Sequence, residues 1–230
     1  FLFIVVLNVM QFNITIGLMR NSYEGNIPEN SINTAEANEN SILKYWKESL
    51  PEYRKLVIGL LVFTVFNSSD VFLLLKAKQA GLDDTAIIGV YIFYNLIYAL
   101  FAFPIGILAD HIGLKSVFIM GLGLFSMVYF GISFNTNFYI FFGLFFLYGV
   151  YAAATEGIAK AWISNISDKK DTATAIGTYT GLQSICTMLA SSMAGLIWYQ
   201  FGAGVTFIVT AMGSIFVVIY FLTLSPLRKV

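Results

Sequence analysis

The chain has 230 residues, of which 58% are apolar and 11% charged, and its 13 acidic and 13 basic side chains balance. Soluble domains carry about 25% charged residues, so this composition excludes an ordinary soluble protein. No basic patch with interleaved aromatic residues lies outside the apolar runs, which argues against nucleic-acid binding. With one cysteine, Cys186, and one histidine, we expect no internal disulfide, no metal site and no cofactor.

Seven apolar runs are each long enough to cross a membrane, since a hydrocarbon core of about 30 Å takes about 20 helical residues. A spanning segment must satisfy its own backbone hydrogen bonds, and barrel strands are much shorter, so we expect helices. The expected spans are residues 1–19, 56–75, 85–109, 116–134, 138–163, 172–199 and 204–224. The predicted fold class is therefore an all-α, polytopic membrane helix bundle with about seven transmembrane helices.

The first run, residues 1–19, contains Asn and Gln and is followed by no small-residue cleavage site, so we interpret it as a transmembrane helix. Residues 20–54 form the only sizeable polar segment, and "NSYEGNIPENSINTAEANENS" within it is typical of a solvated linker. Apolar and aromatic residues then recur at roughly helical spacing: Ile42, Tyr45, Trp46, Leu50 and Tyr53. They indicate either a helix on the inner membrane surface or a solvated connector with aromatic anchors.

The positive charges are unevenly distributed among the loops. If the spans alternate in direction, only Lys76 and Lys78 lie on one side of the membrane, and Lys160 lies within a span. The other side holds Arg20, Lys44, Lys47, Arg54, Lys55, Lys115, Lys169, Lys170, Arg228 and Lys229. By the positive-inside rule this second side, which includes the C-terminus, is predicted to be cytoplasmic.

Two blocks of three spans resemble each other. "IGVYIFYN" and "IGTYTGLQ" share an Ile-Gly-x-Tyr pattern that ends in an amide side chain, Asn95 or Gln183, 88 positions apart. Gly106 and Gly113 similarly precede Gly195 and Gly202 by 89 positions. Because each block has an odd number of spans, the second must cross the membrane in the opposite sense to the first. Such an inverted repeat is typical of transporters that alternate between two openings around a central site.

Polar side chains inside the repeated spans are candidates for a binding site. Asn95 lies ten residues into its span and Gln183 eleven, so both are about 15–17 Å deep, near the midplane. Aromatic and hydroxyl side chains share their helical faces, and we take the following as further substrate-binding candidates: Tyr91, Tyr94, Tyr98, Tyr179 and Thr187. The alternative is that these groups only hold neighbouring helices together.

Ionisable side chains within spans are costly and therefore suggest function. Asp70 is expected in the outer third of its span, near Asn67, and Glu156 about 10 Å from the cytoplasmic end of its own, with Lys160 one turn further on. The inverted repeat would place Asp70 and Glu156 near opposite gates. We hypothesise that one of them titrates during transport and couples proton movement to gate closure. Alternatively, Lys160 pairs with Glu156 structurally, and Asp70 makes a helix-end hydrogen bond.

The stretch "GILADHIGLKSVF", residues 106–118, places polar side chains between two apolar runs. It resembles the loop signature G-x-L-A-D-R-x-G-R-K of the major facilitator superfamily. The matching residues are Gly106, Leu108, Ala109, Asp110, Gly113 and Lys115. His111 and Leu114 replace the two arginines of the signature. The resemblance implies that Asp110 is a conformational latch and Lys115 an interface anchor, whereas the residues alone are also compatible with a simple turn and snorkelling charges.

The resemblance covers nearly the whole chain and implies the C-terminal half of a twelve-span transporter. Residues 1–19 would be the sixth span, residues 20–54 the central cytoplasmic loop, and residues 55–230 the C-terminal six-helix bundle. "NSSDVFLLLKAKQAG" and "TEGIAKAWISN" also look like bacterial members of the superfamily, which implies the inner membrane of a bacterium. The expected partners are a small solute, a proton or other coupling ion, the lipid bilayer and a missing N-terminal half.

These observations predict a secondary active transporter that moves a small solute by alternating access with proton coupling. A non-transporting membrane receptor or scaffold with the same fold is the alternative, because the two could share one sequence. An enzyme is not expected, since the acidic and basic residues fall at different depths and the sequence has no phosphate-binding glycine loop or nucleophile elbow.

Overall fold

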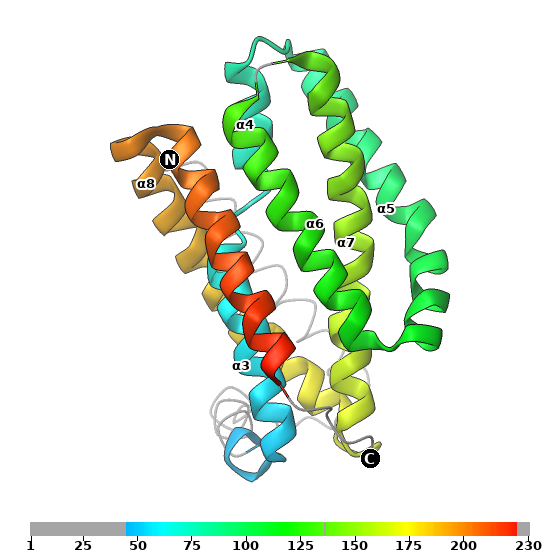
Figure 1. Ribbon diagram of the computed structural model, residues 1–230. Coiled ribbons are helices and arrows are strands. Elements are labelled where there is room, and N and C mark those ends of the chain that lie inside the picture. Colours follow the sequence, from blue (N-terminus) through cyan, green and yellow to red (C-terminus); the bar gives the residue numbers. More distant parts are fainter. Residues whose placement is uncertain (1–44, 136, 225–230) are drawn as a thin grey trace, which may run out of the picture.

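The computed structural model describes residues 45–135 and 137–224, in which all regular structure is helical (Figure 1). The helices are α3 (Pro51–Phe66), α4 (Val71–Gln79), α5 (Asp84–Ile112), α6 (Leu114–Phe134), α7 (Phe138–Ile166) and α8 (Thr172–Thr223). The expected all-α membrane bundle is therefore confirmed. The expected span 1–19 and most of the loop that follows it lie outside the described residues.

Five helical stretches are long and apolar enough to span a membrane, and the last, α8, has 52 residues. Backbone angles at Gly202 are non-helical, with φ 83° and ψ 171°, and the helix reverses direction there (Figure 1). Glycine adopts a positive φ without the steric cost that a side chain brings. The reversal falls between the two spans expected at 172–199 and 204–224, so the described helices supply six crossings.

The first described span is broken in the middle. We expected one helix over residues 56–75, but α3 ends at Phe66, α4 begins at Val71, and the crossing continues to Gln79. The backbone N–H of Asn67 donates to the carbonyls of Phe63 and Thr64, which closes α3. Asn, Ser and Asp side chains compete with the helical backbone for hydrogen bonds, so four such residues in a row explain the interruption.

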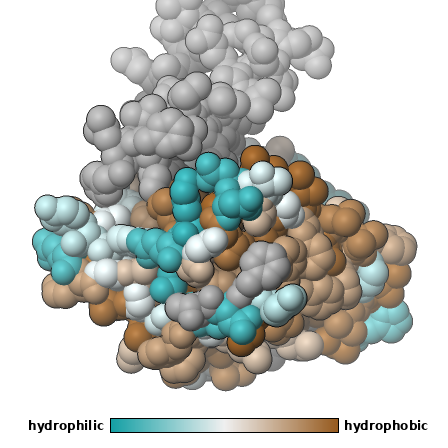
Figure 2. All heavy atoms as spheres, turned by 90° about the horizontal axis from the view of Figure 1, so that it is seen from above, coloured by the Kyte–Doolittle hydropathy of each residue, from teal (hydrophilic) through white to brown (hydrophobic). Residues whose placement is uncertain are grey.

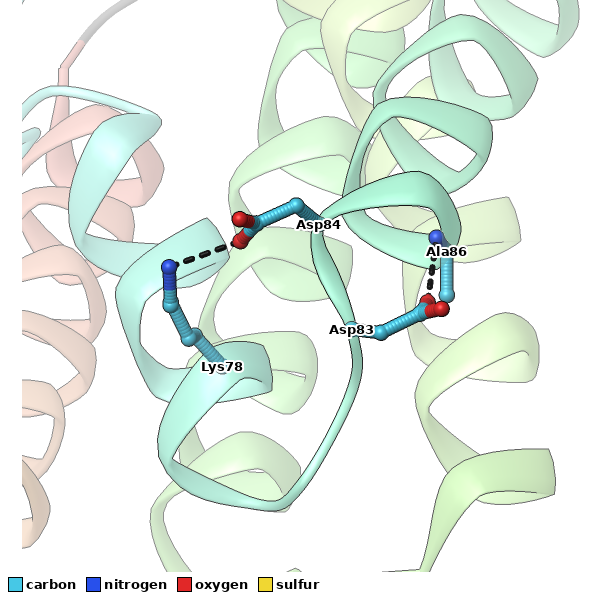
Figure 3. A network of polar contacts seen from close by, with 4 residues as sticks. All are labelled: Lys78, Asp83, Asp84 and Ala86. Carbon is cyan, nitrogen blue, oxygen red and sulfur yellow. Dashed lines mark hydrogen bonds and ion pairs between the residues drawn. The ribbon is translucent and has the colours of Figure 1, made fainter.

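The turn between α4 and α5 fixes one end of the bundle (Figure 3). Gly81 has φ 99°, and the Asp83 carboxylate accepts a hydrogen bond of 2.8 Å from the N–H of Ala86, which caps α5. Lys78 Nζ lies 2.7 Å from Asp84 Oδ1. Both ions are well exposed, so the pair contributes little stability, and the cap determines where α5 begins.

The helices pack around α6, which contacts both α7 and α8 along the bundle (Figure 1). Its buried side chains include Phe118, Leu122 and Phe125. In contrast, α5 lies at the edge of the bundle, where Leu100 and Phe103 are exposed by 59% and 75%. From the end that carries the α4–α5 turn, hydrophobic side chains cover much of the visible surface, and hydrophilic ones gather across the end face (Figure 2). This distribution suits a bundle surrounded by lipid.

The segment before α3 packs against the bundle. Residues 45–48 form one helical turn, and the rings of Tyr45 and Trp46 meet the Tyr53 ring with centroid distances of 5.3 and 6.3 Å. The Tyr53 hydroxyl donates a 2.8 Å hydrogen bond to the carbonyl of Ala175, at the start of α8. The aromatic residues that were expected to be anchors therefore hold this part of the chain against α3 and α8.

Candidate functional site

The break in the first span brings Asp70 against two tyrosines. Asp70 Oδ2 accepts a hydrogen bond from the Tyr94 hydroxyl and Oδ1 one from the Tyr148 hydroxyl, both 2.6 Å long. Tyr94 lies ten residues after the start of α5 and Tyr148 ten after the start of α7, which is about 15 Å along each helix. Both helices have 29 residues, so these bonds place the carboxylate about one third of the way along α5 and α7.

One expectation for Asp70 is wrong and another stays a prediction. We expected Asp70 in the outer third of its span, and in the apolar stretch Pro51–Gln79 it is followed by nine residues; its depth in a membrane stays a prediction. A helix-end hydrogen bond was the alternative. Although Asp70 directly precedes α4, its side chain makes no capping hydrogen bond, and the two tyrosine hydroxyls hold the carboxylate instead.

Several more oxygen atoms surround this carboxylate. Asn67 Nδ2 donates to the Tyr151 hydroxyl at 3.1 Å. Asn67 Oδ1 is buried without a hydrogen-bond partner, and the buried Tyr129 hydroxyl lies close to the hydroxyls of Ser68 and Tyr148. The Tyr129 ring stacks on Phe125 at a centroid distance of 4.1 Å. We name the following residues the Asp70 cluster: Asn67, Ser68, Asp70, Tyr94, Tyr129, Tyr148 and Tyr151.

The second intramembrane carboxylate, Glu156, is exposed on α7 eight residues beyond Tyr148, about 12 Å further along the helix. It interacts electrostatically with Asp70, and Tyr98 and Tyr179 lie near it on α5 and α8. The two carboxylates therefore lie at different levels along α7, and their placement near opposite gates stays a prediction.

Lys160 follows Glu156 by one turn of α7 and is exposed. Its charge acts on Glu156, but within the described part of the chain no ion pair joins the two side chains. The structural pair that we considered for Glu156 is thus not formed. Glu156 remains a carboxylate open to the surroundings, with a tyrosine on each side.

The candidate binding residues divide into two groups. Tyr94 and Tyr179 are 6% and 4% exposed and lie in the core. The other candidates are more accessible. Asn95 is half-buried, and its Nδ2 donates to the carbonyl of Tyr91 at 2.8 Å. Gln183 on α8 is also half-buried, and its backbone carbonyl accepts a 2.9 Å hydrogen bond from the hydroxyl of Thr187. The accessible set, in addition to Glu156, is Tyr91, Asn95, Tyr98, Gln183 and Thr187.

The predicted latch loop joins α5 to α6. Gly113 has φ 91° and ψ 143°, a conformation that a side chain would strain. Lys115 Nζ donates to the backbone carbonyl of Leu224, so it ties α6 to the end of α8, where the helix dipole favours a cation. Asp110 is exposed and has no hydrogen bond or ion pair with any residue that the structure describes.

Gly106 of the same loop makes no close approach to another part of the described chain. A Cβ atom added there would meet nothing within 4 Å. The residue instead borders a groove of about 340 Å³ that runs beside Asp110 between α5 and α7, and Ala102 and Ala161 also line it. The missing side chain of Gly106 therefore leaves surface space, and it is not needed for the packing of two helices in the described chain.

Sequence reasoning missed Ser68, Tyr129, Tyr148 and Tyr151. The available signal was "FNSSD", residues 66–70, a polar run inside an apolar span. The tyrosines gave no comparable signal, because they lie among many other aromatic residues and the rotation of each helix decides which of them face Asp70. Within the described residues, no group of three or more His, Cys, Asp or Glu side chains is placed to hold a metal ion.

Comparison with known proteins identifies relatives. The sequence model of the Major Facilitator Superfamily matches residues 56–230. An uncharacterized MFS-type transporter of the archaeon Methanocaldococcus jannaschii is 35% identical over 158 residues, which cover 66% of this chain and 40% of the relative. The chain thus spans about two fifths of the length of the curated relative that it matches.

Proposed function

Because the chain belongs to the Major Facilitator Superfamily, we propose that it is the C-terminal six-span half of a secondary active transporter that moves a small solute by alternating access. Six crossings in the described residues and the partial coverage of the longer relative support this assignment. A complete transporter would then contain an N-terminal half, and this chain alone would not carry a solute across the membrane.

The solute site would lie around Glu156, among the accessible candidate residues. Asn95 and Tyr98 on α5 and Gln183 on α8 offer amide and hydroxyl groups within the spans. The observation that carries the proposal is the position of Glu156 on α7, within electrostatic reach of tyrosines from both helices. An N-terminal half that covers this face would complete the cavity, as inverted-repeat transporters bind solutes at their repeat interfaces.

Glu156 is the better candidate for proton coupling. It is exposed to the face from which a proton or a solute would arrive, and no ion pair with a described residue holds it ionised. Asp70 is already bound by two tyrosine hydroxyls. A proton on Glu156 would remove one of two interacting negative charges, and it would thereby change the electrostatics of the site during the transport cycle.

Asp110 would act at the membrane surface as the latch between the two halves. It is exposed beside the groove that Gly106 borders, and it has no hydrogen-bond or ion-pair partner in the described chain. A helix N-terminus of the other half could bind this carboxylate in one conformer and release it in the other. The distribution of lysine and arginine favours a cytoplasmic location for this end of the bundle and for the C-terminus.

The test is solute flux into vesicles that contain the full-length protein, with an imposed proton gradient and a broad panel of solutes. Asn95→Ala and Gln183→Ala should each raise the apparent KM by about 2- to 12-fold, which corresponds to one net hydrogen bond. Gln200→Ala is the matched control, since this amide is exposed on the same helix as Gln183 but lies at the end of the span. An equal rise of the apparent KM in Gln183→Ala and Gln200→Ala would contradict the proposed solute site.

Proton coupling and the latch have separate readouts. Glu156→Gln should abolish the response of flux to the proton gradient, whereas Glu48→Gln, at an exposed carboxylate before α3, should not. Asp110→Ala should lose flux but retain solute binding. If the folded full-length protein moves none of the solutes under any gradient, the transporter assignment fails in favour of a receptor or scaffold.

A further inference from the structure

The helices that contribute the neighbours of Glu156 hold no positive charge beside it. Within the 52 residues of α8 there is no charged side chain. In α5 the acidic, basic and histidine residues lie only in the first and last turns: Asp84, Asp110 and His111. Among the accessible candidate residues, Glu156 is therefore the one that can carry a charge, and this charge is negative.

Lys160 and Asp70 do not supply a compensating charge. Lys160 is exposed, forms no ion pair with a described residue, and lies six residues before the end of α7, which is about 9 Å along the helix. A lysine side chain at such a position extends its ammonium group towards the membrane surface. Asp70 interacts electrostatically with Glu156, and its carboxyl group is either neutral or negative. Neither state of Asp70 brings a positive charge to the site.

Aromatic side chains lie beside the same carboxylate. The Tyr98 side chain on α5 is half-buried and within hydrogen-bonding reach of Glu156. Tyr91, two turns earlier on α5, is 47% exposed. Tyr151 of α7 and Tyr179 of α8 also interact electrostatically with Glu156. The face of a tyrosine ring attracts an ammonium group, most strongly in a site from which water is removed.

The charge of the solute determines the free energy of closing the site over Glu156. Once an N-terminal half covers this carboxylate, it loses contact with water, and a buried carboxylate without a positive partner is strongly unfavourable. An anionic solute would add repulsion, and a neutral solute would leave the negative charge uncompensated. A cationic solute would supply the missing partner, while the tyrosine rings and the amide groups contact the rest of its surface.

We propose that the solute of this site is an organic cation, namely a protonated amine or a quaternary ammonium ion, which binds with its charge against Glu156 and the Tyr98 ring. The inference rests on the proposed transport function, since the cation would be the transported solute. The amides of Asn95 and Gln183 would hydrogen-bond to its polar groups. The coupling proton and the organic cation would then occupy Glu156 in turn.

The experiment measures the binding of radiolabelled choline and tetraethylammonium to the purified full-length protein at constant ionic strength. Two competitors share the carbon skeleton of choline: an uncharged alcohol with carbon in place of the nitrogen, and the corresponding carboxylate. Saturable binding of at least one cation is expected, and both competitors should bind at least about tenfold more weakly, because they lack the positive charge. Glu156→Gln should weaken cation binding by about tenfold or more, whereas Glu48→Gln, at an exposed carboxylate before α3, should not change it.

Two further comparisons test the ring and the sign of the charge. Tyr98→Leu should bind the cation about 2- to 5-fold more weakly than Tyr98→Phe, which keeps the ring, since a partly exposed cation–π contact contributes about that much. Lys160→Gln removes a positive charge one turn from Glu156 and should bind the cation at least as tightly as the unmodified protein. Thermal unfolding establishes that each variant is folded. Equal binding by the two Tyr98 variants, or weaker binding by Lys160→Gln, would contradict the proposed contacts.

The outcome can be separated from that of the transport proposal. No saturable binding of either cation by the folded protein, or unchanged binding by Glu156→Gln, overturns the organic-cation site. Saturable flux of a neutral or anionic solute that neither cation inhibits would also overturn it and leave the transporter assignment in place; the other half would then supply the positive charge. Cation binding that depends on Glu156, in a protein that moves no solute, would support the site and overturn the transporter assignment.

Discussion

The helices α5 and α7 approach each other closely at Gly149, which directly follows Tyr148. A Cβ atom added at Gly149 would lie 2.7 Å from the backbone carbonyl oxygen of Tyr94 and 2.8 Å from Ile97 Cβ, whereas ordinary contacts begin at 3.4 Å. The Tyr94 oxygen belongs to the backbone and cannot rotate away, so Gly149→Ala must move the two helices apart by several tenths of an ångström. Overpacking of this kind costs about 1–3 kcal/mol.

Alanine also favours a helix over glycine by up to about 1 kcal/mol, which offsets part of that cost. Gly143→Ala isolates this term, because Gly143 lies on the same helix and a Cβ there meets nothing within 4 Å. We therefore expect Gly149→Ala to lower the free energy of unfolding and Gly143→Ala to leave it unchanged or raise it. The assay is unfolding in mixed micelles by titration with sodium dodecyl sulfate, followed by circular dichroism.

The result that would refute this reasoning is a Gly149→Ala variant as stable as Gly143→Ala. It would mean that α5 and α7 are further apart than the structure shows. The hydrogen bonds from Tyr94 and Tyr148 to Asp70 would then lose their geometric basis, since these tyrosines come from the same two helices.

Two further predictions use the same unfolding assay. Tyr53→Phe should lower the free energy of unfolding by about 1 kcal/mol, because it removes the hydroxyl that donates to the Ala175 carbonyl, whereas Tyr199→Phe, at an 89% exposed ring, should have no effect. A loss of equal size at both tyrosines would contradict the role of that hydrogen bond. Gly113→Ala should cost about 1–3 kcal/mol through its φ of 91°, whereas Gly106→Ala, which meets open space, should not; a stable Gly113→Ala variant would show that the turn adopts another conformation.

Apolar run length was sufficient to predict which described stretches form helices long and apolar enough to span a membrane. The reversal at Gly202 falls in the expected gap between two spans, although a single helical stretch runs through it. The break at residues 67–70 was missed, because the apolar runs before and after it together have the length of one spanning helix. The competition of Asn, Ser and Asp side chains with the backbone was the signal in the sequence, and span counting does not register it.

The site was predictable in part for a related reason. Glu156, Tyr98 and Tyr179 could be selected because polar groups are conspicuous inside apolar spans, and the structure brings them near each other. The partners of Asp70 could not, since a tyrosine in an aromatic-rich helix is indistinguishable from a core residue until the rotation of that helix is known.

The hydrogen bond from Lys115 to the carbonyl of Leu224 joins positions 109 residues apart. The start of α6 and the end of α8 are therefore held together, next to the α5–α6 turn. A movement of that turn would also displace the last turn of α8. In this way the loop beside Asp110 is linked to the end of α8 by a single lysine side chain.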